Sequence, residues 1–247
     1  MNKLFRFKHF KFSWQLGLTL ILLFSIPRFF LVLKANKTGN YQFTSFVFLV
    51  MILSPFLLLM KQGRNAIGMK MPGSIKWLAL SFILGVLASS LAFYLGKLLY
   101  QDTIENWFVY ISKSYSSIPA SELNGDGKFT FFAMFALVGM TFSPIGEELM
   151  YRGLIHESFV PKFGDRKASI LDSLAFGLVH LAHFGLIFRS GSWDLLLIPG
   201  MIWVTLMYLS SRLFFFCKSK TQSIFGAILC HAGFNFGMTY FIFYHIF

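Results

Sequence analysis

The sequence predicts an all-α polytopic transmembrane helix bundle, and three observations support this fold class. Hydrophobic residues make up 56% of the 247 residues and charged residues only 13%, whereas a soluble domain carries roughly a quarter charged residues. The chain has 33 Phe against 10 Asp and Glu, so it has too few charged residues to form the surface of a soluble globular protein. Seven apolar stretches are each long enough to cross a bilayer, which takes about 20 residues. This composition excludes a disordered chain, a secreted disulfide scaffold and most cytosolic enzymes.

The seven predicted spans are 14–34, 42–60, 75–100, 129–154, 168–188, 193–216 and 221–244. They are rich in Leu, Ile and Phe without period-2 alternation, which favours helices over a β-barrel. The basic segment 1–13 precedes a long apolar run that lacks a small-residue cleavage site, so we expect a retained first helix rather than a signal peptide. No repeat or soluble second domain is visible. We therefore predict a single membrane domain over 1–247, with N-terminal helices and an outer loop in 1–128 and the functional helices in 129–247.

Loop charge predicts that the N-terminus is cytoplasmic. With this orientation the inner segments hold 4 Lys and Arg in 1–13, 4 in 61–76, 3 in 162–167 and 3 in 212–220, and the outer loops hold 6. This bias follows the positive-inside rule. The net charge of +12 is thereby explained by orientation, and no basic stripe or nucleic-acid motif is present, so we expect a lipid bilayer and no nucleic acid as partner.

Several polar groups lie inside the predicted spans, where an ionisable group costs at least about 2.5 kcal/mol. Such groups are expected to face the bundle interior or a wet cavity and to carry function. They fall in the fourth, fifth and seventh spans and are Glu147, Glu148, Arg152, Asp172, His180, His231 and Asn235.

The fourth span carries two adjacent acids and an arginine after Pro144, which should kink the helix. Glu148 and Arg152 have the i, i+4 spacing of an intrahelical ion pair. Glu147 is rotated by roughly 100° from Glu148, so one acid can be neutralised locally while the other remains available. The simpler interpretation is a structural salt bridge with Glu147 at the membrane interface.

The fifth and the seventh spans each carry a histidine that shares a helix face with another polar residue. Asp172, Phe176 and His180 share a stripe on the fifth span, and His231 and Asn235 share a face of the seventh. Each alone is better explained as core packing or helix–helix hydrogen bonding. Together they suggest hydrolysis of an acyl compound such as a peptide bond, in which a carboxylate and an imidazole activate water and a second His and an amide stabilise the oxyanion. The sequence equally allows one divalent metal, zinc for example, on Glu147, His180 and His231.

These residues resemble the three motifs of the CAAX-protease and bacteriocin-processing (CPBP, Abi) family of intramembrane proteases. Glu147-Glu148-x-x-x-Arg152 is similar to its EExxxR motif, Phe176-x-x-x-His180 to FxxxH, and His231-x-x-x-Asn235 to HxxxN. All three occur in the family's order on predicted spans. The resemblance covers roughly 129–240, and the first three spans are not distinctive. Seven spans are counted here, whereas eight is the arrangement of the better-known prenyl-protein processing members.

The resemblance implies an intramembrane endopeptidase acting on a membrane-associated peptide or protein in a bacterial cell membrane. It implies that Glu147 and His180 activate water, that His231 and Asn235 stabilise the oxyanion, and that Arg152 and Glu148 brace the first motif, with a catalytic role of Glu148 left open. Members are often labelled metalloproteases, but a metal-free glutamate mechanism is the one we favour. CAAX processing, peptide maturation and bacteriocin immunity all remain open as biological roles.

Two further functions compete with a protease. A proton-coupled transporter could use the same intramembrane groups, but carriers usually show repeated halves, which are absent here. A non-catalytic immunity or scaffold protein would keep the motifs as a polar packing core. The position of Glu147 in the inner half of its span suggests a cavity that opens toward the cytoplasm. The sequence indicates no oligomeric state.

Overall fold

A computed structural model describes residues 4–123, 125 and 127–247, and it confirms an all-α helix bundle. The helices and strands in chain order are α1 (Trp14–Thr38), α2 (Gln42–Leu58), α3 (Lys61–Ala66), α4 (Ile75–Tyr100), α5 (Trp107–Ser112), the 3₁₀ turn η1 (Lys113–Tyr115), α6 (Ala120–Leu123), α7 (Gly127–Glu148), the π-helical segment η2 (Leu149–Ile155), α8 (His156–Val179), the 3₁₀ turn η3 (His180–Ala182), β1 (Leu186–Arg189), β2 (Ser192–Leu195), α9 (Leu197–Thr221), α10 (Ile224–Phe241) and the π-helical segment η4 (Ile242–Ile246).

Each of the seven predicted spans is helical over most of its length. Within the described residues, five helical segments are long and apolar enough to cross a membrane, and they are Trp14–Thr38, Ile75–Tyr100, Gly127–Ala182, Leu197–Thr221 and Ile224–Ile246. The third of these has 56 residues and holds two predicted spans, because the chain turns back at Gly164, whose φ is +73°. The shorter apolar helix α2 corresponds to the remaining predicted span, 42–60.

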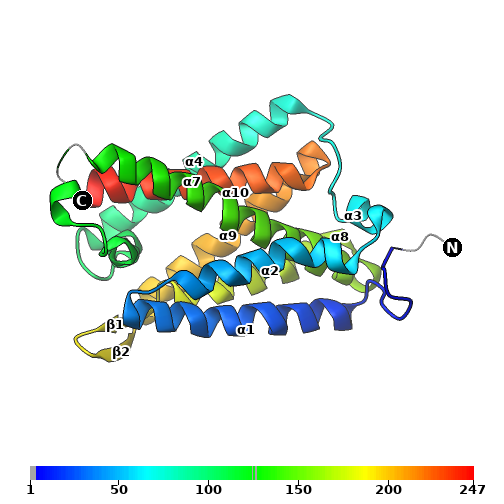
Figure 1. Ribbon diagram of the computed structural model, residues 1–247, viewed down its shortest axis with the longest axis horizontal. Helices are drawn as coiled ribbons and strands as arrows, with labels where there is room; N and C mark the ends of the chain where they lie inside the picture. Colours follow the sequence, from blue (N-terminus) through cyan, green and yellow to red (C-terminus); the bar gives the residue numbers. More distant parts are fainter. Residues whose placement is uncertain (1–3, 124, 126) are drawn as a thin grey trace.

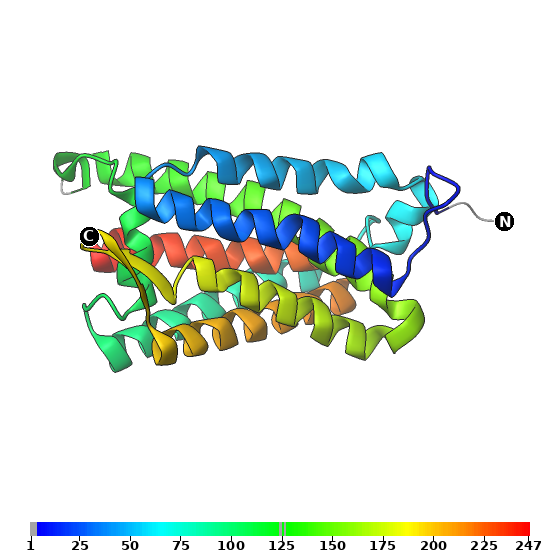
Figure 2. The same ribbon diagram turned by 90° about the horizontal axis from the view of Figure 1, so that it is seen from below.

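The helices lie roughly antiparallel along one long axis (Figures 1 and 2). The start of α1 and the end of η4 lie at opposite ends of the bundle (Figure 1), as an odd number of crossings requires. Serine N-caps begin several of these helices: Ser13 accepts a hydrogen bond from Leu16 N, and Ser223 from Phe225 N. These caps satisfy backbone donors that would otherwise be unpaired.

A short hairpin replaces part of two predicted spans. The fifth span was expected to run to 188 and the sixth to begin at 193, but β1 and β2 pair there in an antiparallel hairpin. The two-residue turn Ser190-Gly191 has φ of +49° and +81°, which matches the primed turns that hairpins favour. The sequence predicted the break between the two spans at 189–192, where the turn lies, but it also predicted helix for 186–188 and 193–195, which form strands instead.

Helix α10 occupies the centre of the bundle and contacts α4, α7 and α9. Of its most apolar section 67% is buried, against 39% or less for the other four long segments. Two glycines allow α4 and α10 to touch backbone to backbone. A Cβ on Gly85 would lie 1.8 Å from the Cys230 carbonyl oxygen, and one on Gly233 would lie 2.1 Å from that of Phe82. Small residues of this kind let membrane helices approach closely.

We expect Gly85→Ala to lower the free energy of unfolding by about 3 kcal/mol, because the added methyl group must push α4 away from α10. Gly139→Ala is the matched control, since the nearest atom to its new Cβ would be Thr239 Oγ1 at 3.9 Å. Thermal unfolding in detergent compares the two variants. An equal melting temperature for both would contradict the close packing of α4 on α10.

Candidate active site

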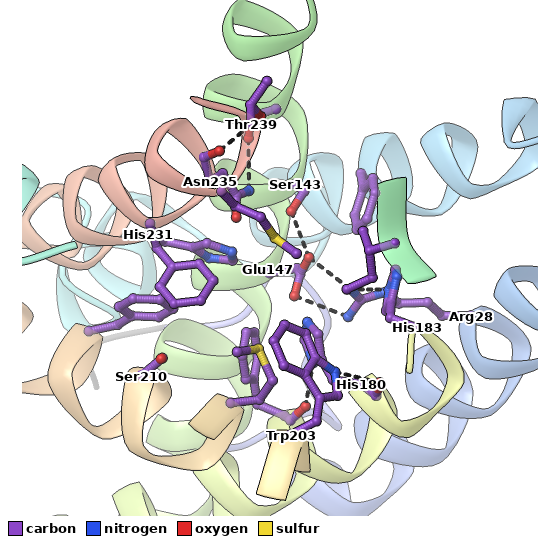
Figure 3. A pocket seen from close by; sticks show the side chains of 18 of the residues that line it. Arg28, Ser143, Glu147, His180, His183, Trp203, Ser210, His231, Asn235 and Thr239 are labelled. Carbon is purple, nitrogen blue, oxygen red and sulfur yellow. Dashed lines mark hydrogen bonds and ion pairs between the residues drawn. The ribbon is translucent and has the colours of Figure 1, made fainter. Parts of the chain in front are cut away.

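Four of the six predicted site residues line one cavity of about 220 Å³, here called the site cavity. Glu147 from α7, His180 from η3, and His231 and Asn235 from α10 all line it. Figure 3 shows Glu147 between His231 on one side and Arg28 and His183 on the other. The structure thus brings together side chains that lie up to 88 positions apart on three helical segments.

Glu147 is held by an ion pair that the sequence analysis did not foresee. Arg28, in the middle of α1, donates from Nη1 to Glu147 Oε2 and from Nη2 to Oε1, each at 3.0 Å. Ser143, one turn earlier on α7, also donates to Oε1 at 2.8 Å. The side chains of Arg28 and Glu147 are only 2% and 1% exposed. Glu147 is therefore not left unpaired, as the sequence had suggested, but lies in a two-point guanidinium clamp.

Glu148 and Arg152 form the predicted i, i+4 ion pair, with Nε to Oε2 at 3.0 Å. Both side chains are completely buried, and neither lines the site cavity. The other oxygen of Glu148 lies 2.8 Å from Nδ1 of His231, which fixes the ring and leaves Nε2 as its other polar atom. The Arg152 guanidinium lies 4.3 Å from the centre of the Phe176 ring, a cation–π contact. The Glu148–Arg152 pair therefore lies outside the site cavity and orients His231, which lines it.

His180 ends α8 and presents one ring nitrogen to the cavity. Its Nδ1 lies 2.7 Å from the Phe176 carbonyl oxygen, which can only accept, so Nδ1 carries the proton and Nε2 of the neutral ring has a free lone pair. The His180 carbonyl accepts from Trp203 Nε1 at 3.1 Å. His183 stacks on His180 with 5.3 Å between ring centres and accepts from Arg28 Nη2 at 3.4 Å.

Asn235 lies one turn after His231 on α10. Its Nδ2 donates to the Gly139 carbonyl oxygen at 2.9 Å, which ties the side chain to α7. A primary amide has two N–H donors, so the second remains for a ligand in the site cavity.

Asp172 does not take part in the site. It was predicted on the same stripe as His180, but its Oδ2 pairs with Nδ1 of His156 at 2.8 Å. The second nitrogen of His156 lies 3.0 Å from Asp165 across the turn at Gly164. Asp172 therefore fastens the two parts of α8 to each other and does not reach the site cavity.

The side chains do not fit a metal centre as the structure arranges them. Among the described residues, no three His, Cys, Asp or Glu side chains are grouped so that they could hold one ion. Binding of a cation to Glu147, His180 and His231 is also disfavoured electrostatically. The positive charge of Arg28 already neutralises the Glu147 carboxylate.

The site cavity lies next to a second cavity of about 690 Å³, here called the end cavity. The two share Phe48, Ile111, Tyr115 and His183. The end cavity is also lined by residues 36–39 at the end of α1 and by Phe188 in β1. With the N-terminus inside, as the loop charges predict, this is the outer end of the bundle, and the opening of the site cavity toward the cytoplasm stays a prediction.

Residues 129–237 match a protein-family model described as type II CAAX prenyl endopeptidase, Rce1-like. The comparisons with curated proteins and with solved structures give no match. The matched segment contains Glu147, His180, His231 and Asn235 but not Arg28. Together with the long apolar helices, the match supports an integral membrane endopeptidase.

Proposed function

Since residues 129–237 match the Rce1-like CAAX-protease family model, we propose that the chain is an intramembrane endopeptidase that hydrolyses a peptide bond by metal-free catalysis. The observation that carries this proposal is the grouping of Glu147, His180, His231 and Asn235 around one cavity. The substrate is a membrane-associated peptide or protein, and both CAAX-type processing and peptide maturation are consistent with this mechanism.

Water is activated by the two groups that can accept its proton. The His180 Nε2 lone pair orients the water, and Glu147 takes the proton as the water oxygen bonds to the substrate carbonyl carbon. Arg28 and Ser143 keep the carboxylate in place before this step. Protonation of Glu147 cancels its charge and weakens its bonds to Arg28.

The oxyanion that forms from the substrate carbonyl needs hydrogen-bond donors. The free N–H of Asn235 is one, and Nε2 of His231 donates when its ring carries both protons, with Nδ1 bonded to Glu148. The carbon–nitrogen bond of the substrate then breaks, and the leaving amine takes the proton from Glu147. Water is thus added across the peptide bond with no other reactant.

A comparison of protein termini tests the proposal directly. Cells expressing the wild type, Glu147→Ala or no copy of the protein are compared by quantitative mass spectrometry at matched expression. We expect a set of new peptide termini with the wild type alone, and these name the substrate. Identical termini in all three, with the cellular phenotype restored by Glu147→Ala, would replace the protease by a scaffold or immunity role.

A further inference from the structure

We infer that the end cavity binds an acidic segment of the peptide substrate, with Lys37 and Lys113 as its anion-binding groups. This inference rests on the proposed function, since it assigns the part of the substrate that remains outside the site cavity. Both lysines line the end cavity, and both are exposed.

The two ammonium groups come from different elements, and each lies near one of two aromatic residues that are hydrogen-bonded to each other. Lys37, at the end of α1, lies 5.8 Å from the centre of the Phe188 ring, and Lys113, in η1, lies 5.3 Å from that of Tyr110. The two rings are linked, because the Tyr110 hydroxyl accepts a hydrogen bond from Phe188 N at 2.9 Å. The cavity therefore has positive charge on two of its sides.

Neither charge is neutralised within the part of the chain that the structure describes. The nearby Arg189 is paired with Asp194, whereas among the described residues no carboxylate forms an ion pair with Lys37 or Lys113. Burial, and next the positive charge of Arg189, lower the pKa of Lys113. A bound carboxylate would relieve this excess of positive charge.

The rim of the end cavity is fixed before any ligand arrives. Asn36 donates to the Ala182 carbonyl oxygen at 2.8 Å, and the Tyr41 hydroxyl donates to Asn36 Oδ1 at 2.8 Å. These bonds join α1 to the start of α2 and to the end of η3. A site held in its binding shape loses little entropy when a ligand binds.

The geometry also gives the register of the acidic segment. Lys37 follows Arg28, the partner of Glu147, by nine positions on α1, which is about 14 Å along a helix. An extended peptide covers about 3.3 Å per residue, so its acidic residues are expected about four positions from the bond that is cut. A substrate peptide must occupy both cavities, because its scissile bond has to reach Glu147 while the flanking residues stay outside. An anionic lipid headgroup does not have to reach Glu147, so its binding would not couple the two cavities.

Binding of short fluorescein-labelled peptides to the detergent-solubilised full chain tests the inference. One peptide carries a Glu-Glu pair, and its matched counterpart carries Gln-Gln. We expect the Glu-Glu peptide to bind about tenfold more weakly to Lys37→Glu/Lys113→Glu than to the wild type, since two partly exposed ion pairs are lost. Lys34→Glu/Lys128→Glu, which alters two lysines that do not line the end cavity, should bind it like the wild type.

A reciprocal measurement guards against a variant that folds badly: a Lys-Lys peptide should bind better to Lys37→Glu/Lys113→Glu than to the wild type. Equal binding of the Glu-Glu and Gln-Gln peptides would overturn the inference. Displacement of the Glu-Glu peptide by short-chain phosphatidylglycerol but not by unlabelled Glu-Glu peptide would overturn it in favour of a lipid site. Peptide binding does not require turnover. If charge-dependent binding persists while the wild type produces no new termini in cells, the proposed function fails and the anion site stands.

Discussion

Replacing Glu147 with Gln is expected to lower kcat by about a thousandfold, the range found when a general base is removed. The amide oxygen can still accept a hydrogen bond from Ser143 or Arg28, so the side chain keeps its place. It cannot take a proton from water, and it removes the negative charge that faces Arg28. The measurement is the steady-state rate of purified protein on a substrate peptide found by the comparison of termini, expressed per folded molecule.

Asp172→Asn is the control for this loss of a carboxylate inside the membrane. Asp172 is as buried as Glu147 and is also paired with a basic side chain, His156, but it does not line the site cavity. We expect its melting temperature to fall and its kcat to stay at the wild-type value. Equal losses of kcat in Glu147→Gln and Asp172→Asn would mean that any buried charge pair is needed, and Glu147 would lose its assignment as the base.

The fold was accessible from the sequence because apolar runs of membrane length have one structural solution. In hydrocarbon every backbone group must be paired within the chain, so such runs become helices. The turn at Ser190-Gly191 lies in the predicted gap 189–192, but the strands β1 and β2 were not predicted, because the apolar residues on either side of the turn continue the runs of the fifth and sixth spans. The reversal at Gly164 was predicted in position, because this glycine lies in the basic inner segment 162–167 between the fourth and fifth spans.

The site was predicted less completely because spacing reports neighbours on one helix only. The Glu148–Arg152 pair follows from its i, i+4 spacing, and the structure has it. The partner of Glu147 lies on α1, 119 positions away, and no periodicity connects the two. The signal in the sequence is Arg28 itself, since it lies inside a predicted span and an arginine at membrane depth needs a partner such as an acid.

Arg28→Met is expected to lower the free energy of unfolding by about 3–5 kcal/mol, because it leaves the Glu147 carboxylate buried without its counter-charge. Methionine fills much of the same volume and keeps the apolar contact with Phe48, over whose ring the guanidinium lies at 5.2 Å. We also expect cleavage to be lost, since the carboxylate is then no longer held beside His180. Thermal unfolding and the rate of cleavage are measured on the same preparation.

The double variant Arg28→Met/Glu147→Leu separates the stabilising role of this pair from its catalytic role. Removing both charges leaves no unpaired ion, and apolar replacements of buried ion pairs are often neutral or stabilising. We therefore expect the double variant to regain most of the melting temperature lost in Arg28→Met while it remains inactive. That combination would show that the chain keeps an unfavourable charge pair at membrane depth for chemistry rather than for folding. A double variant as unstable as Arg28→Met would instead mean that the ion pair itself holds α1 against α7, and the loss of cleavage would then carry no information about the mechanism.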